Sequence, residues 1–237
     1  MLKTFIAFLR LCAYLIRLSP SMREANGLDR AGDTAARDAI VVPRVQEWGR
    51  FIVSLAKGRV EVRGQENIPK DTAVVFIGNH QSYFDIPILL GYVDKPKAFI
   101  SKIEILKAPL LSDWMRLMQC TFLDRKDMRQ SVRAMQEAVA TVKRGYSLVI
   151  FPEGTRSKGG PVKEFKAGSF KLALKAEVPI VPVTIDGSWR LYEDKKSLRE
   201  GDVRITIHPP VETKGLSRED SQTLPDRVRA TVVSALQ

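Results

Sequence analysis

The chain has 237 residues, of which 44% are hydrophobic and 27% charged, so it is long enough to bury one sizeable α/β core and too apolar to remain disordered. Its 38 lysines and arginines exceed its 27 aspartates and glutamates, and the formal net charge of +11 favours an anionic partner: a membrane surface, a phosphorylated substrate or nucleic acid. With two histidines and two cysteines, it lacks the ligands of a common zinc site and the pairs of a disulfide framework, so we expect no metal.

The basic residues are spread along the whole chain rather than gathered in one stretch. No helix-turn-helix, zinc-finger, KH or RNA-recognition motif accompanies them, so nucleic acid is not an expected partner. A membrane surface and a phosphorylated substrate remain.

Residues 2–18 form the first predicted helix, an apolar stretch in which Lys3, Arg10 and Arg17 recur at helical spacing and share one stripe. A helix of this length is about 25 Å long, short of the roughly 30 Å hydrocarbon core of a bilayer. Spanning would also carry Arg10 into the bilayer at a cost of roughly 2.5 to 3.5 kcal/mol. No small-residue cleavage site follows, which disfavours a signal peptide. We therefore expect an interfacial helix whose cations bind an anionic membrane surface.

Residues 19–38 are polar and contain one proline and two glycines, a composition typical of a loop. A second helix is expected over residues 39–57, where Pro43 indicates a start or a kink. Its apolar stripe consists of Val41, Val45, Trp48, Ile52 and Leu55. We interpret residues 1–58 as a two-helix membrane-associating arm, with Trp48 at the membrane interface. The alternative is that either helix packs on the domain.

From residue 59 to residue 237, short strand-like and helix-like runs alternate, which predicts one α/β domain with helices flanking a sheet. The expected strands are 59–63, 73–77, 98–101, 121–123, 147–151, 180–185 and 203–208, and the expected helices include 127–144 and 221–236. In the first of these helices, an apolar stripe expected in the core consists of Met128, Val132, Met135, Val139 and Val142.

Residues 79–85, with the sequence NHQSYFD, follow an apolar run and place one histidine shortly before an acid. His80 is a candidate general base, and Asp85 is the candidate carboxylate that fixes the tautomer of its imidazole. Side chains five residues apart lie about 140° apart on a straight helix, so the pair meets only if His80 lies in the turn before a helix. The same letters also fit a capping box, in which Ser82 and Asp85 start a helix.

A second polar segment, residues 151–157 with the sequence FPEGTRS, begins where another buried-looking run ends. Polar loops at the ends of strands are where α/β proteins keep their sites. In this order and spacing, NHQSYFD and FPEGTRS together resemble the motifs of the glycerophospholipid acyltransferase family, and most closely those of its bacterial members that act on 1-acyl-sn-glycerol 3-phosphate.

The resemblance also includes TFLDR at residues 121–125 and VPIVPV at residues 178–183, and it covers about residues 59–190. Members of the family often carry a glycine shortly before the FLDR-like block, where this chain has Gln119 and Cys120. The departure concerns the backbone path that leads to this block.

The resemblance implies a mixed sheet flanked by helices, of the glycerol-3-phosphate acyltransferase type. It implies transfer of a fatty acyl group from an acyl-ACP or acyl-CoA thioester to the sn-2 hydroxyl of lysophosphatidic acid, giving phosphatidic acid, by direct attack and without a cofactor. Such an enzyme is expected to be a peripheral or monotopic membrane protein on the cytoplasmic face of the cell membrane. The alternatives are another acceptor, such as glycerol 3-phosphate or a lyso-ornithine lipid, and a non-catalytic lipid-binding protein of the same fold.

Arg125 and Arg156 are candidates for binding the acceptor phosphate, because guanidinium groups grip phosphate oxygens and both arginines stand where an apolar run ends. The alternative for each is a surface ion pair. Lys102 is expected to add charge to the same pocket, and Lys166 is a further candidate.

The resemblance also implies that Glu153 contacts acceptor hydroxyls and that Gly154 lets backbone amides approach the substrate, with Thr155 beside them. The alternative is that Glu153 pairs with Arg156. His208 is interpreted as a structural or surface histidine, and Cys12 and Cys120 are interpreted as packing residues.

Two rival enzyme classes fail on their own motifs. The segment after Gly154 resembles a P-loop, but Gly160 stands where the phosphate-binding lysine is required. The G-x-S-x-G sequence of serine hydrolases is absent.

Overall fold

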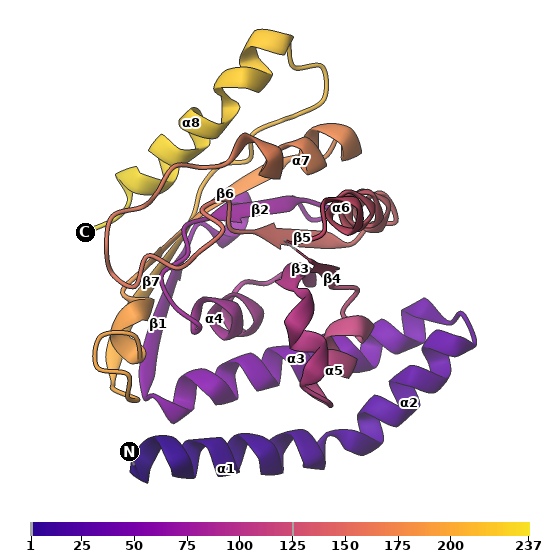
Figure 1. The fold of residues 1–237 in the computed structure, drawn as a ribbon, viewed down its shortest axis with the longest axis vertical. Coiled ribbons are helices and arrows are strands. Elements are labelled where there is room, and N and C mark those ends of the chain that lie inside the picture. Colours follow the sequence, from indigo (N-terminus) through magenta and orange to yellow (C-terminus); the bar gives the residue numbers. More distant parts are fainter. Residues whose placement is uncertain (1, 125) are drawn as a thin grey trace.

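The computed structural model describes the backbone of residues 2–124 and 126–237, and the side chains from residue 5 onward except that of residue 125. Within this part of the chain, one sheet of seven strands runs in the order β1-β7-β6-β2-β5-β3-β4 (Figure 1). The strands are β1 (Gly58–Arg63), β2 (Val75–Gly78), β3 (Lys97–Lys102), β4 (Thr121–Leu123), β5 (Ser147–Ile150), β6 (Ile180–Asp186) and β7 (Gly201–Ile207). All neighbours are parallel except β6 and β7. The predicted mixed sheet is confirmed.

Helices cover both faces of this sheet. They are α1 (Leu2–Arg17), α2 (Ser19–Arg30), α3 (Thr34–Leu55), α4 (Asp85–Tyr92), α5 (Leu111–Leu117), α6 (Met128–Lys143), α7 (Lys171–Ala176) and α8 (Arg218–Ser234). Figure 1 shows α3, α4 and α5 on one side of the sheet and α7 and α8 on the other. Strand β2 supplies both cores, because Phe76 belongs to the cluster with α3 to α5 and Ile77 to the cluster with α6 to α8. Such two-sided burial explains why β2 and β5 are continuous apolar runs.

The prediction of a loop over residues 19–38 is wrong for most of this range, because α2 occupies Ser19–Arg30. Pro20 lies at the start of this helix, where its missing N–H is not needed. Met22 and Ala25 are buried, so tertiary packing outweighs the local loop composition.

Helix α3 begins earlier than predicted, because the Asp33 side chain caps it by accepting a hydrogen bond from the Ala36 N–H at 3.0 Å. It continues through Pro43 and packs along α4. Arg37 of α3 is buried, forms ion pairs with Asp29 and Asp38, and donates a hydrogen bond to the Tyr146 hydroxyl. Helices α2 and α3 are thereby joined to the start of β5, while the domain boundary at residue 58 stays a prediction.

Trp48 lies in α3 and packs against the core that this helix shares with the sheet. Its indole Nε1 is buried and has no hydrogen-bond partner among the described residues. Trp48 is therefore partly buried, and the expected contact of its ring with a membrane stays a prediction.

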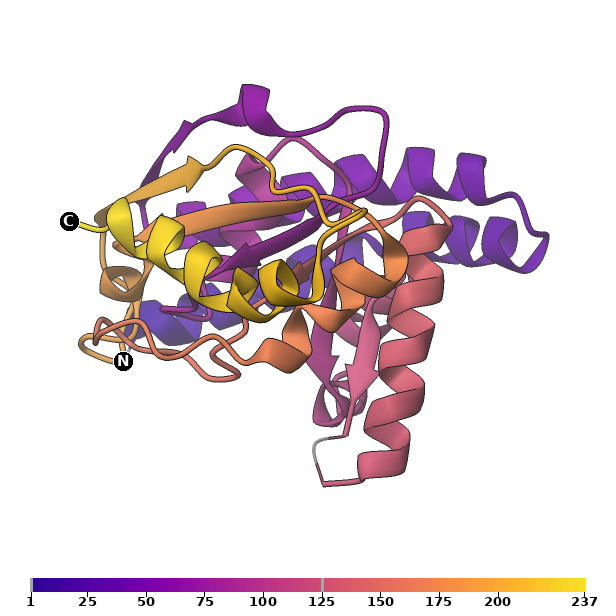
Figure 2. The same ribbon diagram turned by 90° about the horizontal axis from the view of Figure 1, so that it is seen from above.

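Helix α6 confirms the helix predicted at residues 127–144, but not the burial of its whole apolar stripe. Met128 and Val132 are 78% and 51% exposed, because the first turns of α6 extend past the sheet (Figure 2). Within the predicted stripe Val142 is buried, and Met135 and Val139 are partly buried against the core. Ala134 and Ala138 supply further buried contacts.

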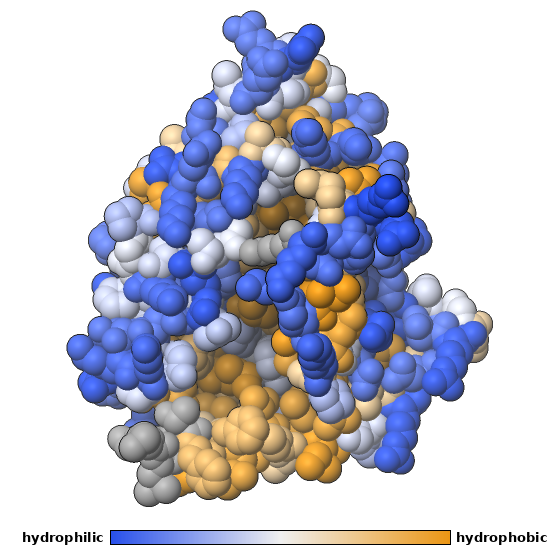
Figure 3. All heavy atoms as spheres, in the orientation of Figure 1, coloured by the Kyte–Doolittle hydropathy of each residue, from blue (hydrophilic) through white to orange (hydrophobic). Residues whose placement is uncertain are grey.

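Helix α1 carries a row of exposed apolar side chains. They are Phe5, Ile6, Phe8, Leu9 and Ile16. Figure 3 shows apolar atoms gathered at the lower end of the molecule, where α1 lies in Figure 1. Of the described helices, no single one is long and apolar enough to cross a membrane, whereas α1 and α2, bent by 46°, meet that test as a pair.

Candidate active site

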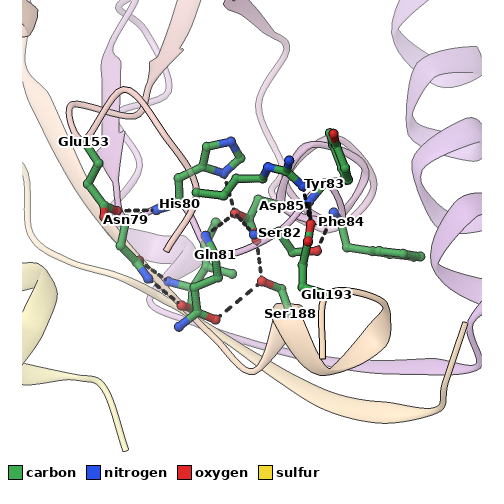
Figure 4. A network of polar contacts seen from close by, with 12 residues as sticks. Asn79, His80, Gln81, Ser82, Tyr83, Phe84, Asp85, Glu153, Ser188 and Glu193 are labelled. Carbon is green, nitrogen blue, oxygen red and sulfur yellow. Dashed lines mark hydrogen bonds and ion pairs between the residues drawn. The ribbon is translucent and has the colours of Figure 1, made fainter. Parts of the chain in front are cut away.

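The two sequence motifs meet at one edge of the sheet. Residues 79–85 follow β2 and residues 151–157 follow β5, and these strands are parallel neighbours. Strand β6, the other neighbour of β2, also ends at this edge and leads into residues 187–193. Three loops from the carboxyl ends of adjacent strands therefore build the site (Figure 4).

Asn79 fixes the first loop to β6. Its side-chain amide donates to the Ile185 carbonyl and its amide oxygen accepts from the Ile185 N–H, both at 2.8 Å. The side chain thus extends the β2–β6 ladder by one pair, which sets the position from which His80 projects.

His80 and Asp85 are in direct contact, with 2.6 Å between Nδ1 and Oδ2. Asp85 is the first residue of α4 and His80 lies in the preceding turn, which is the arrangement that the five-residue spacing requires. An ionised carboxylate only accepts, so the shared hydrogen belongs to Nδ1 and the lone pair of Nε2 is free to take a proton. The His80 side chain is 19% exposed, whereas that of Asp85 is fully buried.

The Asp85 carboxylate also binds the backbone of the turn before α4. Its Oδ2 also accepts hydrogen bonds from the Gln81 N–H at 2.7 Å and the Ser82 N–H at 2.9 Å, while the Ser82 hydroxyl accepts from the Phe84 N–H at 3.1 Å. The same carboxylate therefore closes the turn before α4 and orients His80.

Two residues that sequence reasoning missed complete this network. The buried Ser188 hydroxyl donates to Asp85 Oδ1 (Figure 4). The Gly187 N–H donates to Gln81 Oε1 at 3.0 Å. The available signal was position, because Gly187 and Ser188 directly follow the buried strand β6.

The His80 ring is held from its other side by the second motif. Phe151 stacks on the imidazole, with ring centroids 4.1 Å apart and planes 11° apart. Two backbone hydrogen bonds join the loops, from the Ser157 N–H to the His80 carbonyl at 2.7 Å and from the Lys158 N–H to the Gln81 carbonyl at 3.1 Å.

Glu153 is a buried clamp between the loops. One carboxylate oxygen accepts from the His80 N–H at 2.7 Å and the other from the Lys163 N–H at 3.1 Å. Burial raises the pKa of this carboxyl, and the two backbone hydrogen bonds act in the opposite direction. Because the carboxylate is directed at backbone amides, the geometry favours a positioning role over the expected contact with acceptor hydroxyls. Glu153 does not pair with Arg156.

Arg156 pairs instead with Glu193, a residue that no motif indicated. The side chains of Arg156 and Glu193 are only 20% and 7% exposed. The guanidinium also lies over the ring of Tyr83, 3.4 Å from its centroid. Glu193 in turn accepts a hydrogen bond from the Tyr83 N–H at 3.2 Å.

The remaining candidates occupy different positions around these loops. Gly154 has φ +68°, and an added Cβ would lie 3.3 Å from the Lys166 ammonium nitrogen, so Lys166 extends over this turn. Thr155 is exposed beside it. Lys102 is exposed at the end of β3, and Arg125 lies outside the described residues.

The residues interpreted as structural lie away from this network. His208 shares a hydrogen bond of 2.9 Å with the Thr184 hydroxyl, and burial lowers its pKa. Burial raises the pKa of the Cys120 thiol to about 12. In the described part of the chain, no group of three or more His, Cys, Asp or Glu side chains is arranged to hold a metal ion.

Comparison with known proteins extends these observations. A family model described as Acyltransferase matches residues 59–186. A chloroplastic 1-acyl-sn-glycerol-3-phosphate acyltransferase from Brassica napus is 40% identical over 156 residues, which are 65% of this chain but 45% of that protein. A 1-acyl-sn-glycerol-3-phosphate acyltransferase from Borreliella burgdorferi is 32% identical over 184 residues, covering 77% of this chain and 74% of that protein. The crystal structure of a 1-acyl-sn-glycerophosphate (LPA) acyltransferase from Thermotoga maritima superposes with a TM-score of 0.77 at 33% identity, covering 97% and 94% of the two chains.

Proposed function

The chain belongs to the acyltransferase family, and on that premise we propose that it transfers a fatty acyl group to the sn-2 hydroxyl of lysophosphatidic acid, giving phosphatidic acid. The observation that carries this proposal is the His80–Asp85 pair, whose buried acid leaves Nε2 of a partly exposed imidazole as the only ring nitrogen able to accept a proton. The names of the Brassica and Borreliella relatives support the acceptor. The chain spans less than half the length of the plant relative that it matches, so the acceptor is part of the proposal.

The reaction follows from this geometry. Nε2 of His80 removes the proton of the acceptor hydroxyl while the oxygen attacks the thioester carbonyl. The C–S bond breaks as the tetrahedral intermediate collapses, and the proton on the imidazolium passes to the departing thiolate. Asp85 stabilises the imidazolium between these two transfers. No acyl-enzyme forms, and the products are an ester and a free thiol.

The Glu153 carboxylate keeps the base in place. It holds the His80 N–H, while Phe151 covers one face of the ring. We assign both to positioning, because neither requires contact with substrate.

The acceptor phosphate is assigned to the positive side chains at the same edge of the sheet. Arg156 is placed near the base by the backbone hydrogen bond between Ser157 and His80, and the Lys166 ammonium lies over Gly154 in the same loop. Lys102 and Arg125 complete the proposed set, with Arg125 resting on its sequence motif alone. Thr155 is exposed beside Arg156, where it would contact the acceptor headgroup.

Helix α1 is the proposed membrane contact. Exposed Phe5 and Phe8 supply apolar burial, and exposed Arg10 and Arg17 supply attraction to anionic headgroups. The side chain of Lys3 lies outside the described residues. We propose a peripheral or monotopic protein on the cytoplasmic face of the cell membrane, which suits an acceptor that resides in a bilayer.

The test is a panel of acceptors assayed with purified protein. Lysophosphatidic acid, glycerol 3-phosphate and a lyso-ornithine lipid are each supplied with acyl-ACP and with acyl-CoA, and product mass and released thiol are measured. We expect phosphatidic acid from lysophosphatidic acid at the highest kcat/KM, with one thiol released for each ester formed. A preference for another acceptor would replace the proposed substrate, and the absence of any thiol release would leave a lipid-binding protein.

A further inference from the structure

The Arg156 guanidinium already has an anionic partner within the chain. It forms an ion pair with Glu193, and the two side chains are only 20% and 7% exposed. The pair is therefore not one of the solvent-exposed ion pairs that contribute little free energy. An arginine that is to bind a phosphate is thus charge-compensated before the substrate arrives. An anion can bind Arg156 only if it competes with the Glu193 carboxylate.

We propose that Glu193 is a specificity-determining residue, whose carboxylate occupies Arg156 until the phosphate of the acceptor exchanges for it. The inference rests on the proposed function, because it assigns Arg156 to the acceptor phosphate. An uncompensated arginine attracts any anion. A guanidinium held by a carboxylate selects an anion that binds it better than a carboxylate does, and a dianionic phosphate monoester, with three terminal oxygens, meets that requirement.

The contacts of Glu193 make the exchange possible without leaving a buried charge alone. Its carboxylate also accepts a hydrogen bond from the Tyr83 N–H at 3.2 Å, which persists when the guanidinium turns away. Its own backbone N–H donates to the Trp189 carbonyl at 2.8 Å and fixes the position of the residue. Burying an unpartnered carboxylate is costly, so this second partner is what permits Arg156 to leave.

Tyr83 limits how the phosphate approaches. Its ring lies 3.4 Å below the guanidinium carbon of Arg156, and the side chain of Tyr83 is 62% exposed. One face of the guanidinium is therefore covered, so a phosphate would bind it edge-on, in the bidentate contact that suits a phosphate. The exchange is then between two edge-on partners, Glu193 and the phosphate.

The segment that carries Glu193 also carries Ser188, which holds Asp85. A single loop after β6 therefore contacts both Asp85, the carboxylate that orients His80, and Arg156, the proposed phosphate ligand. Neither FPEGTRS nor NHQSYFD includes this loop, and the assignment comes from the three-dimensional contacts alone.

The test uses Glu193→Gln, which keeps the shape of the side chain and an oxygen for the Tyr83 N–H but removes the charge. We expect the KM for lysophosphatidic acid to fall about tenfold with a smaller change in kcat, because a neutral partner competes less well for the guanidinium. The preference for a phosphate monoester over a lysophospholipid with a phosphodiester headgroup should fall as well. In an Arg156→Ala background, the same substitution should change neither quantity.

A matched control separates the contact from the general charge of the protein. Asp202 forms an exposed ion pair with Arg59, and Asp202→Asn removes one negative charge in the same way. We expect it to leave the KM unchanged. An equal fall in KM for Asp202→Asn and Glu193→Gln, or a rise in KM for Glu193→Gln, would overturn the inference.

Binding of inorganic phosphate, measured by calorimetry, separates this inference from the proposed function. Tighter binding by Glu193→Gln and loss of binding by Arg156→Ala would support the exchange even in a protein that acylates no lysophosphatidic acid. Unchanged phosphate affinity in a Glu193→Gln protein that retains the transferase activity would reject the exchange and keep the function. If Glu193→Gln does not fold, Glu193→Asp, which withdraws the carboxylate by one methylene, is expected to shift phosphate affinity in the same direction, and an unshifted affinity counts against the exchange.

Discussion

The buried hydroxyl of Ser188 donates a hydrogen bond to the Asp85 carboxylate oxygen that faces away from His80. Oδ2 contacts the imidazole and Oδ1 contacts Ser188, so the carboxylate is held at both oxygens and its plane is fixed. In the proposed mechanism this carboxylate must keep its orientation toward the base. Ser188 adds a restraint at Oδ1 to those that the Gln81 and Ser82 N–H groups supply at Oδ2.

Replacing Ser188 by alanine should therefore lower kcat and leave the KM for acceptor nearly unchanged. A hydrogen bond to a charged group contributes about 1.5 to 3 kcal/mol, which corresponds to a loss of roughly tenfold to a hundredfold. Ser188→Thr, which keeps the hydroxyl, should recover part of the rate. The measurement is steady-state kinetics of both variants, and equal kcat for Ser188→Ala and wild type would show that the hydroxyl serves only packing.

Glu153→Gln should reduce both stability and turnover. The Glu153 carboxylate accepts from two backbone N–H groups, those of His80 and Lys163, whereas a glutamine has one accepting oxygen and directs an NH₂ group at the other N–H. We expect a loss of about 1 to 3 kcal/mol in the free energy of unfolding, because one buried donor loses its partner. Denaturant unfolding checks this, and an unchanged midpoint would contradict the clamp. Glu164→Gln, an exposed neighbour, is the control.

Because of Lys97, the free energy of unfolding should rise with pH in the alkaline range. Lys97 is buried in β3, its ammonium donates to the Leu89 and Val93 carbonyls at 2.9 and 2.8 Å, and burial lowers its pKa from 10.5 to about 7, against a smaller opposite effect of Asp94. Between about pH 7 and 10.5 the unfolded chain binds the proton that the folded protein has lost, so stability rises with pH across this window.

The comparison is with Lys97→Met, which removes this titration. At pH 8 to 9.5 the wild type should gain up to about 1.4 kcal/mol per pH unit more than the variant, the value for one proton. Taking the difference between the two proteins cancels groups that both share, such as Cys120. Parallel stability curves from denaturant unfolding at pH 7.5 and 9 would show that Lys97 keeps its proton in the folded state.

Removal of residues 2–18 should detach the protein from anionic vesicles and lower activity on vesicle-borne acceptor more than on a short-chain soluble one. The apolar residues of α1 and its arginines are lost together, whereas the His80 network contains no residue of α1. Reversing Lys3, Arg10 and Arg17 to glutamate should weaken binding to anionic vesicles only, since the apolar side chains remain.

The control for the vesicle experiment reverses Arg218 and Arg227 on α8, which lies at the opposite end of the molecule from α1 (Figure 1). Sedimentation with neutral and anionic vesicles compares all variants. Equal binding by every variant would mean that α1 packs on the domain and does not anchor the protein.

The sequence indicated the contacts of the site that are local. His80 and Asp85 lie in one turn, so their spacing and chemistry indicate that they meet. Glu153 came from the family resemblance alone, and its backbone partners were not foreseen. Ser188 and Glu193 escape such reasoning, because Ser188 is 103 residues from Asp85 and Glu193 is 37 residues from Arg156. Only the adjacency of β2, β5 and β6 brings these side chains together.

In the fold, too, local features could be predicted from the sequence and features that depend on distant contacts could not. A buried strand such as β5, found at Ser147–Ile150 within the predicted residues 147–151, is indicated by its apolar run. The sequence pattern did not predict helix α2 or the exposure at the start of α6, because both depend on how the segments pack in three dimensions. A polar segment becomes helical where Met22 and Ala25 are buried, and Met128 becomes exposed where a helix extends beyond the sheet.

The most direct measurement is acyl transfer to lysophosphatidic acid by purified His80→Ala, with phosphatidic acid identified by mass and thiol release followed in time. We expect a rate lower by about 10²- to 10⁴-fold, the contribution of a general base, with the melting temperature and phosphate affinity of the wild type. A His80→Ala protein that forms phosphatidic acid within a few-fold of the wild-type rate would contradict the assignment of His80 as the base, and with it the mechanism.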